Sequence, residues 1–443
     1  MPALTTFRSP VLSLWQSAID EVLARAPSSG RALQGARGNL RADTALMQQA
    51  ITAAERVLRP DAARATPTLT GVITDCAELY VQLILAEARG DAAQVAALAN
   101  QIPFSNCDPL WAEVFLTYEH YRLAGATIPY RPYQQLDDYI LPLPGAPNAP
   151  VRIALLADWG TGTPAATALL ADIARQRPDV LIHLGDIYYS GTQREVQERF
   201  LAICRAMPGL AIPIYTLAGN HDMYAGGGGY YWLLDQLQQP ASYFCLHNDA
   251  WQILAMDTGL HDSDPGSVVS NVTALDPQEA VWQRDKLRHA GGRRTVLLSH
   301  HQLLSAVDGV GMTSGGQVLA VNPHLYAVFS DLLDDVAWWL WGHEHNLISF
   351  APYMGLMRGR CIGSAAVPKL VDEQPYTPNP ALVVPSGQRE APQMDPQVAL
   401  GTDGRFYRHA YAVLTLQGRA ATMTYYEMTD AGSRILFTEG VAA

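Results

Sequence analysis

The chain has few cysteines, no long apolar run and a deficit of positive charge, and each shortage excludes a class of protein. Its five cysteines are widely spaced and form no Cys-x-x-Cys pair, which favours reduced thiols in a cytoplasmic protein over a disulfide framework. No apolar run reaches the roughly 18 residues that a membrane span needs. Lys and Arg number 30 against 42 Asp and Glu, a net charge of −12, which argues against a nucleic-acid partner.

The N-terminus also lacks a basic region followed by a sustained apolar stretch, so the sequence shows no signal peptide. A mature chain that had lost a leader would look the same. The cytoplasmic location is therefore an expectation that assumes no leader has been removed. What the chain does have is 49% hydrophobic and only 16% charged residues, typical of a well-buried globular protein. Its 443 residues predict two or three folded units.

Two regions differ in their hydrophobic period. Residues 1–145 repeat apolar side chains at helical spacing, which predicts an all-α accessory domain. The segment Leu141–Pro150 is rich in proline and marks the boundary to a second domain over 146–443. The sequence does not decide whether the first domain sets oligomeric state, shields a site or binds a partner.

The second domain alternates strand-like and helix-like segments, and its tail consists of strands. Strands are predicted near 151–158, 179–186, 212–218, 242–247, 251–258, 295–300, 347–353, 355–362, 406–416 and 420–428. Helices are predicted near 165–176, 194–206, 276–289 and 323–335. The Pro-rich stretch 368–400 is predicted to be a long loop. This order indicates an α/β fold in which two sheets pack together with helices outside.

Five of the apolar runs end in side chains that can hold a metal ion, and these runs organise the chain. They deliver Asp158, Asp186, Asn220, His300 and the pair His343/His345. Taken singly, each motif is ordinary turn chemistry or a surface histidine. Because ligands gather outside the carboxyl ends of strands in α/β sheets, the set together predicts a metal site at one rim.

Two cations a few Å apart repel each other and need a bridging anion, which a single carboxylate supplies. Asp186 suits this position because Gly185 beside it lets the backbone approach closely. At strand spacing His343 and His345 point the same way, so that one reaches each metal, while Glu344 faces away. His183, inside a strand, is interpreted as a core residue.

In this order the motifs Asp-x-Gly, Gly-Asp-x-x-Tyr, Gly-Asn-His-Asp, His and Gly-His-x-His resemble the calcineurin-like metallophosphoesterases, and specifically the purple acid phosphatases, over about residues 151–362. Most of the superfamily has His where this chain has Gly160; purple acid phosphatases place a Tyr three residues after the bridging Asp, here Tyr189. The resemblance implies a four-layer α-β-β-α metallophosphoesterase sandwich.

The resemblance also implies the ligands of two metal ions. The first metal would be held by Asp158, Asp186, Tyr189 and His345, and the second by Asp186, Asn220, His300 and His343. A phenolate ligand favours ferric iron at the first position, and iron, zinc or manganese would occupy the second.

The implied reaction is hydrolysis of a small phosphate monoester by in-line attack of a metal-bound hydroxide. Asp186 would bridge the two metals, and His221 would assist the leaving group. A phosphodiesterase acting on cyclic nucleotides or other small diesters shares this chemistry, and a non-catalytic binding scaffold is a further alternative. His301 is open between a substrate contact and a structural histidine. Oligomeric state and natural substrate stay open.

Overall fold

The computed structural model describes Gly125 and residues 127–443, apart from 145–148, 265, 266, 268, 269, 368, 370 and 405. Ile128–Ala443 pack together as one unit, which begins upstream of residue 146, where the second domain was expected to start. The predicted helical accessory domain lies almost wholly outside the described residues and stays a prediction. None of the helices in the described part of the chain combines the length and apolar character needed to cross a bilayer.

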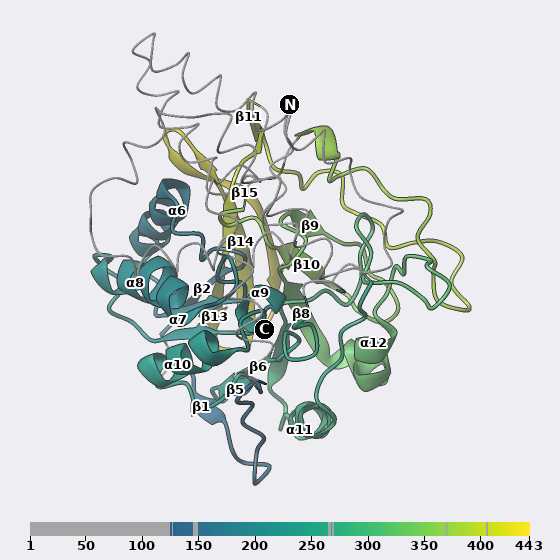
Figure 1. Cartoon of the computed structure of the whole chain (residues 1–443), viewed down its shortest axis with the longest axis horizontal. Coiled ribbons are helices and arrows are strands. Elements are labelled where there is room, and N and C mark those ends of the chain that lie inside the picture. The colour runs from purple at the N-terminus through teal and green to yellow at the C-terminus, as the bar shows by residue number, and fades with distance from the viewer. Residues whose placement is uncertain are drawn as a thin grey trace. The chain divides into compact units, whose positions relative to one another are not determined.

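Two large β-sheets form the centre of this unit (Figure 1). The first has the strand order β1-β5-β6-β7-β8-β10-β9. Its strands are β1 (Ile140–Pro142), β5 (Phe244–His247), β6 (Trp251–Ala255), β7 (Arg294–Leu298), β8 (Val336–Trp341), β9 (Leu347–Ser349) and β10 (Gly359–Ile362). Strands β6, β7 and β8 run parallel, so their carboxyl ends meet at one edge.

The second sheet has the order β15-β14-β13-β2-β3-β4. Its strands are β2 (Val151–Leu156), β3 (Val180–His183), β4 (Ile214–Thr216), β13 (Ala410–Gln417), β14 (Ala420–Thr429) and β15 (Gly432–Val441). Strands β2, β3 and β4 are parallel, whereas β13, β14 and β15 form an antiparallel meander. A separate two-stranded ribbon joins β11 (Thr402–Asp403) to β12 (Phe406–Tyr407).

The period-2 alternation of each strand separates the layers. In β8, Trp338 and Leu340 lie in the core between the two sheets, whereas Trp339 and Trp341 lie in the core under the outer helices. β2 alternates in the same way between the inner core and a third cluster on its outer face. Strands buried on both faces must be apolar throughout, which is why these segments read as continuous apolar runs.

Helices cover the outer faces of both sheets (Figure 1). The helices of the described chain are α6 (Pro164–Arg175), α7 (Gln193–Glu195), η4 (Val196–Leu201), α8 (Ala202–Ala206), α9 (Asn220–Met223), α10 (Gly228–Leu237), α11 (Pro277–Arg288), α12 (Pro323–Phe329), η5 (Leu333–Asp335) and η6 (Val371–Glu373). Helices α6 and η4 pack on the second sheet, and α11 and α12 on the first. The predicted α-β-β-α sandwich is confirmed for the described residues.

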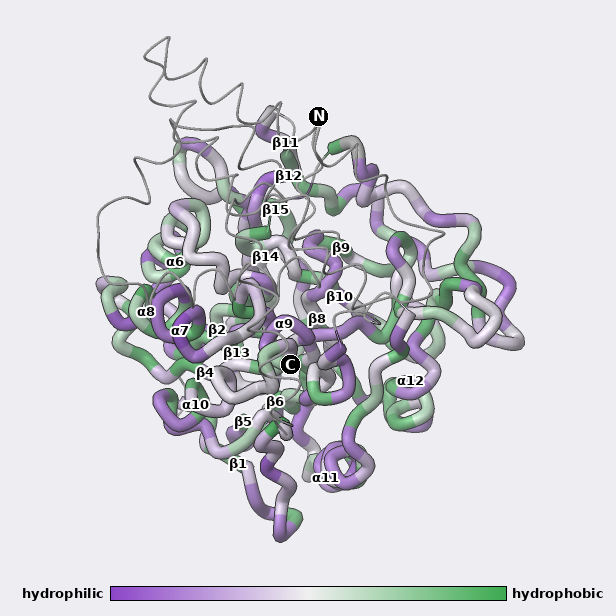
Figure 2. The backbone as a smooth tube through the Cα atoms, in the orientation of Figure 1, coloured by the Kyte–Doolittle hydropathy of each residue, from purple (hydrophilic) through white to green (hydrophobic). Residues whose placement is uncertain are grey.

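Helix α11 illustrates how the local sequence sets an element. Asp276 caps it by accepting hydrogen bonds from the N–H groups of Gln278 and Glu279, and Pro277 occupies its first turn, within the range 276–289 predicted for a helix. The helix is hydrophilic along most of its length (Figure 2) and docks on the sheet through Trp282 and Leu287.

An aromatic strap fastens the segment before β2 to the first sheet. Tyr243 lies 5.3 Å from Tyr139 and 5.4 Å from Trp282 between ring centroids, and its hydroxyl accepts the N–H of Tyr133 at 2.8 Å. Strand β1 then pairs parallel to β5 at the edge of the sheet.

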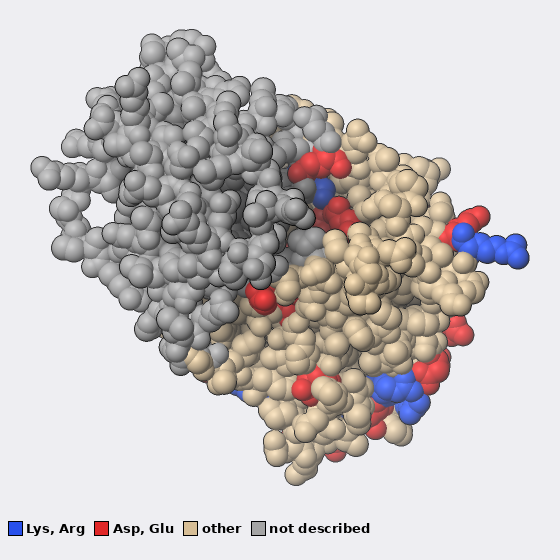
Figure 3. All heavy atoms as spheres, turned by 45° about the vertical axis from the view of Figure 1, so that its right-hand side comes forward, with Lys and Arg blue, Asp and Glu red and all other residues tan. Residues whose placement is uncertain are grey.

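The face of the molecule in Figure 3 carries its charged side chains in small separate groups, with no broad basic area among the described atoms.

The predicted long loop over 368–400 contacts the chain just after β8. In its described part Tyr376 donates its hydroxyl hydrogen to the carbonyl of Leu347 at 3.2 Å, and the carbonyl of Pro375 accepts from Asn346 Nδ2 at 3.0 Å. These bonds fix the turn that follows His343 and His345.

Candidate metal centre

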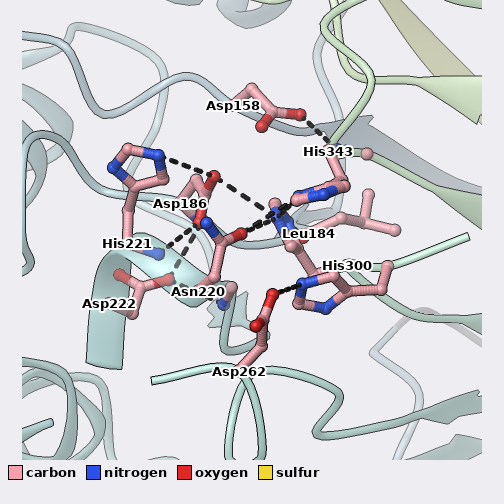
Figure 4. Close-up of polar contacts among 12 residues, drawn as sticks. Asp158, Leu184, Asp186, Asn220, His221, Asp222, Asp262, His300 and His343 are labelled. Atoms are coloured by element: carbon pink, nitrogen blue, oxygen red, sulfur yellow. Dashed lines mark hydrogen bonds and ion pairs between the residues drawn. The ribbon is translucent and has the colours of Figure 1, made fainter. Parts of the chain in front are cut away.

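Five strand ends from the two sheets bring their polar side chains to one rim. Asp158 follows β2, Asp186 follows β3 and Asn220 follows β4, while His300 follows β7 and His343 follows β8. Figure 4 shows these side chains pointing toward one another between the ends of the strands. The structure therefore brings together residues that lie up to 185 positions apart in the chain.

Four donor atoms converge to form what we call site 2, made of Asp186, Asn220, His300 and His343. Asn220 Oδ1 lies 3.2 Å from His300 Nε2 and 3.0 Å from His343 Nδ1, and these two ring nitrogens are 3.3 Å apart. His300 Nε2 is also 3.3 Å from Asp186 Oδ2. Donor atoms that share one metal ion are separated by distances of about this size.

A second group of donors forms site 1, made of Asp158, Asp186, Tyr188 and His345. The Tyr188 hydroxyl lies 3.0 Å from Asp158 Oδ1, 3.3 Å from Asp186 Oδ2 and 2.9 Å from His345 Nε2. His345 Nε2 is 3.4 Å from Asp158 Oδ1. Carboxylate and phenol oxygens are hard donors, and an imidazole nitrogen is of intermediate softness. This mixture suits iron, manganese or zinc.

Tyr189, the expected phenolic ligand, is the one predicted residue that the structure does not bring to this group. Its ring lies under the Arg199 guanidinium, 4.8 Å from the centroid, and its backbone N–H donates to Glu195 Oε1 at 2.6 Å. The neighbouring Tyr188 occupies the expected place. The family spacing counts residues, whereas side-chain direction depends on the backbone turn after Asp186, which the spacing does not specify.

One oxygen belongs to both sites. Asp186 Oδ2 is 3.3 Å from the Tyr188 hydroxyl in site 1 and 3.3 Å from His300 Nε2 in site 2. The other oxygen, Asp186 Oδ1, accepts the backbone N–H of His221 at 3.0 Å (Figure 4). The two oxygens of Asp158 also have different partners. Its Oδ2 accepts the N–H of His343 at 2.9 Å, and its Oδ1 faces site 1.

Unusual backbone conformations present several of these ligands. Positive φ angles occur at Asp158 (57°), Asp186 (71°), His343 (67°) and His345 (52°). Residues other than glycine rarely adopt this left-handed region, and such strain persists mainly at functional sites. Gly185 is needed for close approach, since a Cβ there would stand 2.7 Å from His300 Nδ1.

Asp222 holds the two loops that carry Asp186 and Asn220 together. Its Oδ2 accepts the N–H groups of Asp186 and Gly219, both at 2.9 Å, and its Oδ1 accepts the N–H of Ile187 at 3.2 Å. The side chain is fully buried. In the sequence this Asp appears only as the last letter of Gly-Asn-His-Asp, which is also ordinary turn chemistry.

His221 lies beside both sites in a fixed orientation. Its Nδ1 is 2.6 Å from the carbonyl oxygen of Tyr189, which only accepts, so Nδ1 carries the proton and donates it. Its Nε2 then faces the cluster, 3.9 Å from Asp186 Oδ2. The ring lies 4.5 Å from the Tyr188 ring and 4.8 Å from the Tyr224 ring.

Burial and the bridging carboxylate control the charges of the cluster. Burial alone would lower the pKa of His300, but the Asp186 carboxylate outweighs it and raises that pKa to about 9. Burial would raise the pKa of Asp186, yet His300 and His221 hold it well below its usual range. Burial, together with neighbouring His301 and His300, keeps the pKa of His343 well below its ordinary value.

Histidines outside the two sites have other partners. His301 lies 3.0 Å from Thr258 Oγ1 through Nδ1 and 3.0 Å from Asp262 Oδ2 through Nε2, which favours the structural interpretation. His183 is fully buried and bonded to Thr216 Oγ1, as expected of a core residue. Nothing in the sequence pointed to Thr258 or Asp262, because neither belongs to a motif.

Comparison with known proteins agrees with this geometry. Residues 151–347 match the family model of the calcineurin-like phosphoesterases. The matched segment begins with β2 and ends just after His345, so it contains every residue of sites 1 and 2. It supports the metallophosphoesterase superfamily for this part of the chain. The purple acid phosphatase type is a finer assignment than the match supports. No curated protein sequence matches the chain.

The solved structures that match the chain have low sequence identity to it. GAP50, titled the anchor in the inner membrane complex of Plasmodium, is 15% identical, with 66% of this chain and 88% of that chain covered and a TM-score of 0.44. Vps29 from Entamoeba histolytica complexed with Zn²⁺ is 9% identical, with coverage of 66% and 98% and a TM-score of 0.27. Vps29 from Cryptosporidium parvum is 11% identical, with coverage of 66% and 99% and a TM-score of 0.28.

Proposed function

We propose that this protein is a dinuclear metal-dependent phosphoesterase that hydrolyses small phosphate monoesters, in the manner of a purple acid phosphatase. The observation that carries the proposal is Asp186 Oδ2, a single carboxylate oxygen 3.3 Å from the Tyr188 hydroxyl of site 1 and 3.3 Å from His300 Nε2 of site 2. Two cations held close together need such a shared anion. All the other donors of both sites surround it within the same rim.

The donor atoms support the identity of the metals. We assign the first ion to Asp158, Asp186, Tyr188 and His345, and the second to Asp186, Asn220, His300 and His343. The phenol of Tyr188, in place of the expected Tyr189, favours ferric iron in site 1, while the imidazole and amide donors of site 2 suit iron, zinc or manganese. When bound, these ions supply an activated water and neutralise charge on the phosphoryl group.

The chain's own residues orient the substrate and move a proton. His221 donates Nδ1–H to the Tyr189 carbonyl, so a second proton on its ring resides on Nε2, the atom that faces Asp186. That proton is placed to bond a phosphoryl oxygen and to pass to the leaving oxygen. Burial lowers the pKa of His221 below its ordinary value, and the Asp186 carboxylate beside Nε2 offsets only part of this effect.

The metal assignment is tested by metal analysis and visible spectroscopy of protein purified without chelators. A tyrosinate–ferric absorption band should be present in wild type, absent in Tyr188→Phe and retained in Tyr189→Phe, because only the Tyr188 hydroxyl is in site 1. A protein that never retains transition ions would refute the proposal and favour a binding scaffold. A band lost in Tyr189→Phe instead would restore Tyr189 as the ligand.

The reaction is tested with an aryl phosphate and the corresponding aryl phosphodiester. Faster turnover of the monoester, reduced at least 100-fold by His221→Ala, is the expected result, given that general acid catalysis contributes about 100- to 10,000-fold. Faster turnover of the diester would convert the proposal into a phosphodiesterase. A cytoplasmic location, a small phosphorylated substrate and the absence of a nucleic-acid partner stay predictions.

A further inference from the structure

The amide of Asn220 has two different ends, and they face different partners. Its oxygen, Oδ1, lies 3.0 Å from His343 Nδ1 and 3.2 Å from His300 Nε2, on the side of site 2. Its nitrogen, Nδ2, donates a hydrogen bond to the hydroxyl of Tyr224. An amide oxygen has lone pairs for a metal ion, whereas an amide NH₂ group only donates and has none to offer. The side that Oδ1 occupies therefore decides whether site 2 has four ligands or three.

Tyr224 is held firmly in position for this contact. It follows the short helix α9 directly, four residues after Asn220, and is only 4% exposed. Its ring packs beside the His221 ring, 4.8 Å between centroids. A phenol anchored in this way gives the amide nitrogen a fixed partner on the side opposite to the metal ligands.

We propose that Tyr224 is a positioning residue for site 2, which orients the Asn220 amide so that Oδ1 and not Nδ2 faces the metal position. The inference deepens the proposed function, since it requires that site 2 take a metal. Tyr224 contacts no donor atom of site 1 among its hydrogen bonds in the described structure, so its effect is specific to site 2. Partners that orient a metal ligand are typically worth about 10- to 100-fold in metal affinity.

The test compares Tyr224→Phe with Tyr230→Phe as a matched control. Tyr230 is also a buried phenol, in the neighbouring helix α10, and its hydroxyl donates to the carbonyl of Thr216 at 3.0 Å and not to a donor of either site. Metal-free protein is titrated with Zn²⁺ against a competing chelator, and urea unfolding of each metal-free variant is measured alongside. We expect Tyr224→Phe to weaken one of the two Zn²⁺ affinities about 10- to 100-fold and to leave the other unchanged. Tyr230→Phe should change neither.

A double-mutant cycle separates orientation from general structural support. Asp in place of Asn220 presents two chemically equivalent oxygens and needs no partner to choose between them. In the Asn220→Asp background, Tyr224→Phe should therefore change Zn²⁺ affinity less than about twofold. An equal loss in both backgrounds would overturn the orienting role.

The outcomes distinguish this inference from the proposed function. If wild type binds only one Zn²⁺ or none, both fail together. If wild type binds two ions and Tyr224→Phe binds them with the same affinities, only the role of Tyr224 is refuted. A parallel fall of both affinities would likewise refute it.

Discussion

Asp222 provides the most direct test of how the fold builds the metal centre. Its carboxylate accepts three backbone N–H groups, from Asp186, Gly219 and Ile187, at 2.9, 2.9 and 3.2 Å. Two of them belong to the loop after β3 and one to the loop after β4. Removing the carboxylate should therefore lower the free energy of unfolding. It should also let the loops that carry Asp186 and Asn220 move relative to each other.

The geometry sets the size of the effect. Burial and the nearby Asp186 carboxylate raise the pKa of Asp222 to about 8, so its carboxyl is largely uncharged near neutral pH in metal-free protein. Asp222→Ala leaves three buried N–H groups without their acceptor, and with about 1–3 kcal/mol for each such group we expect a loss of roughly 3–5 kcal/mol once water enters the space. Asp222→Asn keeps an oxygen for Asp186 and Gly219 but turns an NH₂ group toward the N–H of Ile187. That single mismatch should cost about 1–3 kcal/mol.

Urea unfolding of metal-free protein measures both losses, and Zn²⁺ titration measures the effect on the sites. Asp172 in α6 is the matched control, because it is also buried and accepts from Tyr411 and Arg175, neither of which is a donor of site 1 or site 2. Asp172→Ala should destabilise the protein without changing metal affinity, whereas Asp222→Ala should reduce affinity for both ions about 10- to 100-fold, the usual effect of losing a partner that positions metal ligands. Wild-type metal affinity in Asp222→Ala would refute the reasoning.

Three further perturbations have defined outcomes. Tyr243→Leu removes ring contacts to Tyr139 and Trp282 and should lower the free energy of unfolding by roughly 3 kcal/mol in a urea titration, so an unchanged midpoint would contradict the role of the strap. In metal-free protein the His300–Asp186 pair raises the pKa of His300 to about 9, so its stabilisation should be complete below about pH 6.5 and disappear as the pH rises through 9. This pair should contribute roughly 3 kcal/mol to the difference in stability between pH 6 and pH 10, so the difference measured in His300→Gln should be smaller by that amount. Chelation should lower the melting temperature of wild type reversibly, with recovery on adding Zn²⁺, and an unchanged melting temperature would argue against bound ions.

The strand ends were predictable from the sequence because two independent physical signals coincide there. Continuous apolar runs identify strands buried on both faces, and a polar residue after each run marks where the strand leaves the core. Parallel β2, β3 and β4, and parallel β6, β7 and β8, then bring Asp158, Asp186, Asn220, His300 and His343 to one rim. No fine geometry was needed for that conclusion.

The choice between Tyr188 and Tyr189 was beyond the sequence. Both are tyrosines, adjacent in Gly-Asp-Ile-Tyr-Tyr, and the side chain that turns inward depends on the left-handed conformation of Asp186 and on the packing of Arg199 over the Tyr189 ring. Spacing alone could not reveal either feature.

The glycine run 226–229 shows a different limit. Four consecutive glycines predict a flexible loop, yet Gly228 begins helix α10. A Cβ on Gly229 would stand 2.2 Å from the carbonyl oxygen of Gly191, so the residue is small because two backbones meet there. The sequence shows that these residues have no side chain. It does not show whether glycine is needed there for backbone flexibility or for close contact between two backbones.

In Asp186 and in Asp158 the two carboxylate oxygens have different partners, and in Asp186 this difference would allow one oxygen to be shared by two metals. Asp186 commits Oδ1 to the backbone N–H of His221, and Asp158 commits Oδ2 to that of His343. Each aspartate therefore keeps one oxygen for coordination, and in Asp186 that oxygen is equidistant from donors of both sites. A carboxylate free to rotate would chelate one cation with both oxygens. The backbone donors oppose such a rotation, so the loops after β3, β4 and β8 would decide which carboxylate oxygen a metal pair could share.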